Sequence, residues 1–312
     1  MELKSDFAVQ IEETTDNKGD LNMKISTEIA SAARLVGEAK AIKYIAEAGF
    51  DSWDFSMFDM CKTAYDAFRV KNTKDIFRTL THPLHSRQYL AYARQLKRIG
   101  EHYGITCNQS HAPFPTSDPR VRSYLKRAIE CTAEAGGKIC VIHPQNNASA
   151  KENAEMYLEL LPFAKQHGVK IAAENMWNWN LGNIVPAACS SPEDFNAHLD
   201  AVDDDFLVAC LDIGHAEMSG VHTSAVEMIH ALGSRLQALH IHDNDGVYDK
   251  HQIPFSMNID FEAIMKALRE INYQGDLTLE ASEYLKKYDA ANVLDGLKEM
   301  AESAKKLKEV IL

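Results

Sequence analysis

The sequence predicts an α/β protein with the (β/α)₈ architecture, a TIM barrel. Eight short apolar runs, typical of strands buried on both faces, alternate with segments of helical periodicity from residue 23 onward. An open doubly wound sheet and a closed barrel both fit such an alternation, and eight units favour the barrel. No GxGxxG motif follows the first run, which counts against a dinucleotide-binding sheet.

The expected strands are mostly near-continuous apolar runs. The clearest is LVACLD, which ends in Asp212, and LTLE, which ends in Glu280, has the same form. In chain order, strands are expected at residues 23–27, 50–58, 105–114, 138–144, 169–176, 206–215, 236–245 and 276–282.

The expected helices carry apolar residues at helical spacing and end at glycines. The first has Leu35 and Ile42 on one face and stops at Gly49. Ser117 and Asp118 are candidate N-caps of a later helix. In order, helices are expected at residues 32–48, 86–103, 117–135, 149–166, 191–199, 223–232, 260–270 and 289–310, with a polar helix-and-loop region before residue 86.

The composition is that of an ordinary globular protein, with 46% hydrophobic and 25% charged residues among 312. The net charge of −12 repels phosphate backbones and anionic membranes on average. No apolar stretch is long enough to span a bilayer. We therefore expect neither nucleic acid nor a membrane as a partner.

The N-terminal 22 residues are expected to be an extension, followed by a single catalytic barrel domain at residues 23–312. The extension is acidic and lacks the apolar segment of a signal peptide. The six cysteines form neither a CxxC pair nor a disulfide-like framework, which indicates a reducing compartment. These features predict a cytoplasmic protein.

Carboxylates and imidazoles end six consecutive expected strands, from the third to the eighth. The active site of such a barrel lies at the carboxyl ends of its strands, so these side chains should meet. They are His111, His143, Glu174, Asp212 with His215, His240 with His242, and Glu280, and the loop after the seventh strand adds Asp249 and His251. Any one of them alone would be explained as a polar end to its strand, but six in succession indicate a common site.

Carboxylates crowded in this way repel one another unless a cation lies between them. We expect a cage of Glu174, Asp212, His240 and Glu280 that holds a divalent metal. Mixed oxygen and nitrogen ligands suit Mn²⁺, Co²⁺ or Zn²⁺, and Mg²⁺ less well. Of the two histidines in HIH, only His240 is expected to point inward at the level of the other ligands, with His242 supporting a ligand instead.

Aromatic residues follow two of these strand ends. Trp177 and Trp179 lie in an expected long loop after Glu174, and Phe114 follows His111. Aromatic faces at these positions would stack on a sugar ring or a base. A hydrophobic plug in the loops explains the same residues equally well.

At these positions the chain resembles the xylose isomerase-like barrel superfamily. Members include sugar isomerases and epimerases and the endonuclease IV type of apurinic-site nuclease. The resemblance runs from about residue 23 to the C-terminus. It rests on HAPF at 111, HP at 143, EN at 174, DIGH at 212, HIHDND at 240, DKH at 249 followed by NIDF, and LE ending at 280.

In the epimerase branch, the resemblance implies that Glu174, Asp212, His240 and Glu280 hold the metal. It further implies that the two glutamates are the catalytic acid and base and that His215 binds or polarises a sugar oxygen. The expected activity is metal-dependent isomerisation or epimerisation of a monosaccharide or sugar phosphate through an enediolate. The arginine that ketose epimerases carry after the seventh strand is missing, because NDGVYD fills that stretch.

Two alternatives stay open. In the nuclease branch three zinc ions are held by residues that match His111, His143, Glu174, Asp212, His215, His240, Asp249, His251 and Glu280. The acidic charge and the lack of basic, aromatic-interleaved loops argue against this branch. The other alternative is a dehydratase or lyase acting on an inositol or polyol. Related barrels are often dimers or tetramers, so the resemblance suggests a homo-oligomer while the sequence gives no oligomeric state.

Overall fold

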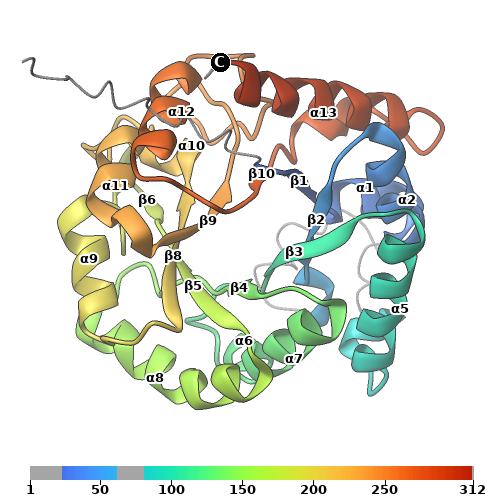
Figure 1. Cartoon of the computed structure of the whole chain (residues 1–312). Coiled ribbons are helices and arrows are strands. Elements are labelled where there is room, and N and C mark those ends of the chain that lie inside the picture. The colour runs from blue at the N-terminus through green and yellow to red at the C-terminus, as the bar shows by residue number, and fades with distance from the viewer. Residues whose placement is uncertain (1–22, 62–80, 311–312) are drawn as a thin grey trace, which may run out of the picture.

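Eight parallel strands form one sheet in the order β10-β1-β2-β3-β4-β5-β8-β9. A parallel bridge between Ile241, just after β9, and Leu279 of β10 joins the two ends of the sheet. The computed structural model describes residues 23–61 and 81–310. Figure 1 shows the helices arranged as a ring around the strands. The predicted (β/α)₈ barrel is therefore confirmed.

All eight predicted strands are present, and each is shorter than expected. Their bounds are β1 Ile25–Glu28, β2 Ser52–Ser56, β3 Thr106–His111, β4 Ile139–Val141, β5 Lys170–Glu174, β8 Leu207–Asp212, β9 Leu236–His240 and β10 Leu277–Leu279. The sixth is cut short because the Asp212 carboxylate accepts a hydrogen bond from the His215 amide, at 2.8 Å, and so caps a helical turn.

The expected helices are all present in their predicted places, but two are divided and one short helix after β8 was not predicted. The expected first helix is divided at Gly37 into α1 and α2, and the helix expected from residue 117 is divided into α6 and α7. The α-helices are α1 Ala30–Val36, α2 Glu38–Ala48, α5 Tyr89–His102, α6 Pro119–Arg122, α7 Leu125–Ala135, α8 Ala150–His167, α9 Pro192–Asp200, α10 Ile213–Ala216, α11 Ala225–Leu232, α12 Phe261–Glu270 and α13 Val293–Glu309. Single 3₁₀ turns are η1 Phe58–Met60, η2 Pro83–His85, η3 Gly233–Arg235 and η4 Tyr284–Lys287.

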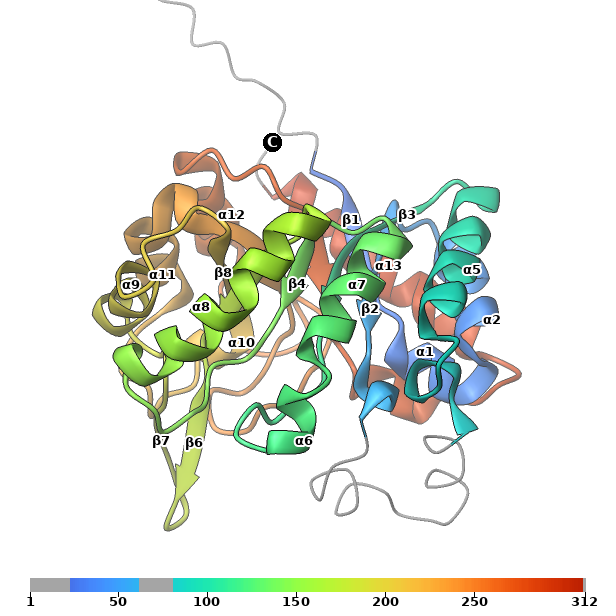
Figure 2. The ribbon, with the colours of Figure 1, turned by 90° about the horizontal axis from the view of Figure 1, so that it is seen from below.

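The segment expected to be a long loop after the fifth strand is an antiparallel hairpin. It consists of β6 Trp177–Asn180 and β7 Asn183–Pro186. Leu181 and Gly182 form its turn with φ values of 48° and 85°, the left-handed conformation of a tight hairpin turn. Figure 2 shows the hairpin projecting beyond the helices at the end where β5 finishes.

The core has two parts, one between strands and helices and one inside the barrel. Alternate residues of β2, Trp53 and Phe55, are fully buried in the larger part. The smaller part consists of short side chains inside the barrel, Val141, Ala172, Val208, Cys210 and Ala238. Small residues suit this interior because the strands leave little space there.

The expected N-terminal extension, residues 1–22, and much of the polar region before residue 86 lie outside the described residues. None of the helices within 23–61 and 81–310 combines the length and the apolar character needed to cross a bilayer.

Leu211 tests the packing between sheet and helices. It is fully buried on the helix-facing side of β8, whereas Leu158 on α8 is 50% exposed. We expect Leu211→Ala to lower the free energy of unfolding by about 2–5 kcal/mol, because it leaves a cavity. The matched control Leu158→Ala should change it by no more than about 0.5 kcal/mol. Urea unfolding followed by circular dichroism measures both, and equal effects would contradict the assigned packing.

Candidate metal centre

The ends of four strands bring the expected cage together. Glu174, Asp212, His240 and Glu280 each offer one ligand atom, and these atoms lie within 4.8 Å of one another. His240 Nδ1 is 3.2 Å from Glu174 Oε1 and 3.6 Å from Glu280 Oε2. The first three side chains are buried, and Glu280 is 16% exposed. Glu280 is therefore the member of the cage most accessible from solvent.

A buried oxygen without a partner indicates that this cage fits a cation. Asp212 Oδ2 is buried and has no hydrogen-bond partner among the described residues, and Glu174 Oε2 faces only imidazole nitrogens. A buried acceptor without a partner is unfavourable, and native proteins contain few of them. Carboxylate oxygens with one imidazole nitrogen are ligands that divalent first-row metals accept.

Two further histidines adjoin the cage on the Glu174 side. His143 Nε2 lies 3.0 Å and His111 Nε2 3.5 Å from Glu174 Oε2. The two Nε2 atoms are 2.9 Å apart. Together with Glu174 these histidines form a second group of donors close enough to share an ion.

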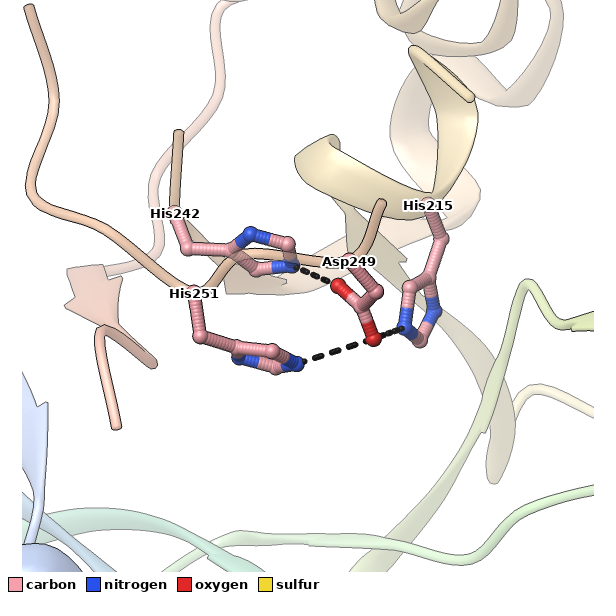
Figure 3. A group of neighbouring side chains, drawn as sticks. All are labelled: His215, His242, Asp249 and His251. Atoms are coloured by element: carbon pink, nitrogen blue, oxygen red, sulfur yellow. Dashed lines mark hydrogen bonds and ion pairs between the residues drawn. The ribbon is translucent and has the colours of Figure 1, made fainter. Parts of the chain in front are cut away.

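A cluster of three histidines around Asp249 lies on the Asp212 side (Figure 3). Asp249 is 3.5 Å from His215 Nε2, 3.4 Å from His242 Nε2 and 3.0 Å from His251 Nε2. The Nδ1 atoms of His215 and His251 lie 2.9 Å and 2.7 Å from the carbonyl oxygens of Asn175 and Glu280. In each of these two rings Nδ1 donates its N–H to the carbonyl oxygen, and Nε2, on the other side of the ring, faces Asp249.

His242 is more central than the sequence analysis expected. Its Nε2 lies 3.1 Å from Asp212 Oδ1, so it does contact a cage residue, but it also faces Asp249. The expectation that only His240 points inward was wrong. Residues two apart on a strand point to the same face, and His240 and His242 are two apart.

Opposite charges balance within the cage. Burial on its own would raise the pKa of the Glu174 carboxyl, but the imidazoles around it, chiefly those of His240 and His143, hold this pKa well below its ordinary value. Burial on its own would lower the pKa of His240, but Cys210, Glu174 and Glu280 raise it well above the usual range.

The same balance holds around Asp249. Despite burial, Asp249 raises the pKa of His251 to about 10, and Asp212 and Asp249 raise that of His215 well above its ordinary value. Protons on imidazoles therefore compensate the carboxylates. A divalent cation is the other source of positive charge, and its binding would release those protons.

Two of the three predicted stacking residues contact histidines of the site. The Phe114 ring stacks on His143 with centroids 4.8 Å apart, and Trp177 meets His215 edge-on at 6.5 Å. Trp179 is 51% exposed and lies 6.4 Å beyond Trp177 on the hairpin. Phe58 also packs against His111, with centroids 5.0 Å apart.

Two polar residues that hold site residues in place were not predicted from the sequence. Asp54, in the middle of β2, lies 3.4 Å from His240 Nε2. The Asn175 amide group accepts from Asp212 N at 2.7 Å and donates to Asp212 O at 2.9 Å. The signal for Asp54 was present, because it alternates with Trp53 and Phe55 and so faces the barrel interior.

Two curated relatives match about half of this chain. The chain is 30% identical over 190 residues to the uncharacterized protein MJ1311 of Methanocaldococcus jannaschii, an alignment that covers 54% of this chain. It is 28% identical over 167 residues to the uncharacterized protein y4fM of Sinorhizobium fredii, covering 50% of this chain. The matches span only 62% and 51% of the lengths of these two relatives.

Solved structures with the same fold include three whose descriptions name a sugar epimerase or a bound zinc. A D-tagatose 3-epimerase-like protein has a TM-score of 0.65 at 22% identity, over 93% of this chain and all of the other. The 3-keto-D-glucoside 4-epimerase YcjR of E. coli has a TM-score of 0.62 at 18% identity, over 90% of this chain and 99% of the other. The IolI protein, solved with a zinc atom, has a TM-score of 0.65 at 17% identity, over 91% of this chain and 99% of the other.

A family model described as a xylose isomerase-like TIM barrel matches residues 42–310, most of the chain. This match covers every expected metal ligand, from His111 to Glu280. The resemblance seen in the sequence motifs is thereby confirmed, and the chain belongs to the family of xylose isomerase-like TIM barrels.

Proposed function

We propose that this protein is a divalent-metal-dependent isomerase or epimerase that acts on a monosaccharide or sugar phosphate. The observation that carries the proposal is the cage itself, in which two glutamates share one set of ligand atoms with Asp212 and His240. Two carboxylates at one reacting centre can act as the base that removes a proton from carbon and the acid that returns one. The epimerases among the structures of the same fold support this choice.

The proposed roles follow from exposure and contacts. One of Glu174 and Glu280 removes the proton next to the substrate carbonyl, and the other returns a proton to the resulting enediolate. The His215 imidazole, only partly accessible beside Trp177, donates to a sugar oxygen. Phe114 and Trp177 cover the histidines and limit the access of water. A bound Mn²⁺, Zn²⁺ or Co²⁺ would act as a Lewis acid toward neighbouring substrate oxygens.

A nuclease function is the second candidate, and one specific observation favours it. All nine residues that match the zinc ligands of the nuclease branch lie in or beside the centre, including the cluster of His215, Asp249 and His251. The net charge of −12 opposes it, because affinity for DNA depends largely on phosphate contacts by lysine and arginine. A dehydratase or lyase acting on an inositol would use the same carboxylates as acid and base.

Solvent exchange tests the proposed proton transfer. A panel of ketoses, aldoses and inositols is incubated with the metal-loaded protein in D₂O, and deuterium incorporation at carbon is followed by NMR. With a substrate that exchanges, Glu280→Gln should lower the rate by about 10²–10⁴-fold, because an acid or base is lost. The control Glu283→Gln changes an exposed glutamate nearby and should leave the rate unaltered. If no member of the panel exchanges, the proposed chemistry is wrong.

Metal content and DNA incision separate the two candidates. We expect about one firmly bound ion per chain in the purified protein, because the cage offers one set of four donors. An apurinic-site duplex should remain intact under conditions in which sugar exchange is rapid. About three zinc ions per chain together with incision at enzymatic rates would instead establish the nuclease, whose zinc-activated water attacks phosphate.

Gly214 tests whether His242 supports the cage. A methyl group at Gly214 would lie 1.9 Å from the His242 ring, so the ring must move away from Asp212. We expect Gly214→Ala to weaken Co²⁺ binding by about 10–100-fold, as loss of a partner of a metal ligand usually does. The matched control is Gly275→Ala, whose methyl group meets the Tyr273 hydroxyl at 2.2 Å. Isothermal titration calorimetry measures the Co²⁺ affinity of both variants. Equal affinities in the two variants would show that His242 does not support the cage.

A further inference from the structure

Asp54 is a buried carboxylate of the barrel interior that does not belong to the cage. Its side chain is fully buried on β2, and its Oδ1 atom has no hydrogen-bond partner within the described parts of the chain. Its Oδ2 atom accepts from Gln109 Nε2 at 3.0 Å and lies 3.4 Å from His240 Nε2. A carboxylate buried this deeply is unfavourable unless it is paired, and His240 is its ionisable partner.

The two nitrogens of His240 face in different directions. Nδ1 is directed into the cage, 3.2 Å from Glu174 Oε1, whereas Nε2 is directed at Asp54. A neutral imidazole has one N–H and one free lone pair, so it can bind a cation through Nδ1 only if its proton is on Nε2. A carboxylate facing Nε2 favours that tautomer and fixes the plane of the ring.

Asp54 is itself held by a second residue. Gln109, on β3, donates from Nε2 both to Asp54 Oδ2 and to the carbonyl of Leu239, at 3.0 Å and 3.3 Å. Leu239 precedes His240 on β9, so β2, β3 and β9 are joined at this level of the barrel. His111, also on β3, stacks on the His240 ring with centroids 5.3 Å apart. The ring of His240 is therefore fixed by contacts on its face and at Nε2.

We propose that Asp54 is a positioning residue, which holds His240 with its proton on Nε2 and so presents Nδ1 to a cation in the cage. The inference rests on the metal centre proposed above and not on the identity of the substrate. Asp54 would contact neither the cation nor the sugar. Its effect on the centre would pass entirely through His240.

A double-mutant cycle on metal affinity tests this. Co²⁺ is titrated calorimetrically into the metal-free full-length protein without substrate. Asp54→Asn should weaken binding by about 10–100-fold, as removal of the partner of a metal-bound histidine generally does. In a His240→Ala background, the same change should have no further effect, because the residue through which Asp54 acts is gone. Gln109→Ala should weaken binding in the same direction, and that loss should also disappear when His240 is replaced.

The control is Asp276→Asn. Asp276 is a partly buried carboxylate that pairs with β2 through Ser52 Oγ, at 2.5 Å, and it is not among the cage donors. Its replacement removes the same charge and should leave Co²⁺ affinity unchanged. Histidine ¹⁵N spectra recorded at a sub-saturating Zn²⁺ concentration give a second readout. The signal of His240 bound through Nδ1 with its proton on Nε2 should be strong in the wild type and weaker in Asp54→Asn at the same Zn²⁺ concentration.

The outcomes separate the inference from the proposed function. If the wild type binds Co²⁺ and Asp54→Asn binds it equally well, the inference is wrong while the metal centre stands. An equal loss in the His240→Ala background would also overturn it, because Asp54 would then act on the fold in general. If the wild type binds no divalent cation, the proposed centre fails together with the inference. If Asp54→Asn does not fold, Gln109→Ala with and without His240→Ala provides the same comparison of Co²⁺ affinities.

Discussion

The concentration of buried carboxylates and imidazoles at one end of the barrel is the constraint on which the rest of the structure depends. Glu174 and Asp212 are almost completely buried, and Asp212 keeps an oxygen that no described donor satisfies. Charges in such a place are unfavourable unless opposite charge lies beside them. Protonated imidazoles provide it in the absence of a cation, and a cation replaces those protons when it binds.

Parallel register brings these residues together without any special loop. Asp212 and His240 are direct partners across β8 and β9, and Glu174 pairs with Cys210, two residues before Asp212. Beneath them the interior is filled by short side chains such as Ala172 and Ala238. Gly214 leaves room for the His242 ring, which occupies the space that a side chain at this position would need. The backbone thus fixes the donors before any ligand is considered.

The barrel could be predicted from the sequence because strand-like segments alternate with segments of helical periodicity, although β1, β2 and β3 contain many polar residues. The cage could be predicted because Glu174, Asp212, His240 and Glu280 end such runs. Asp54 was not predicted because it lies in the middle of β2 and not at a strand end. It reaches the site only by pairing across the barrel interior with His240 of β9. The β6–β7 hairpin was not predicted because β6 alternates Trp with Asn and β7 is only four residues long. Its pairing also depends on the left-handed Leu181–Gly182 turn.

Membership of the family does not determine the reaction, because the resemblance implies matching donors in both the sugar epimerases and the zinc nucleases. What distinguishes the two functions is the surroundings of the donors. A nuclease must hold a polyanion, and a chain with a net charge of −12 has little to attract one. A sugar needs aromatic faces and neutral hydrogen-bonding groups, and here Phe114 and Trp177 lie against His143 and His215. The candidate metal ligands therefore limit the chemistry proposed for the site, whereas the residues around them are the reason for proposing a small polyhydroxylated substrate.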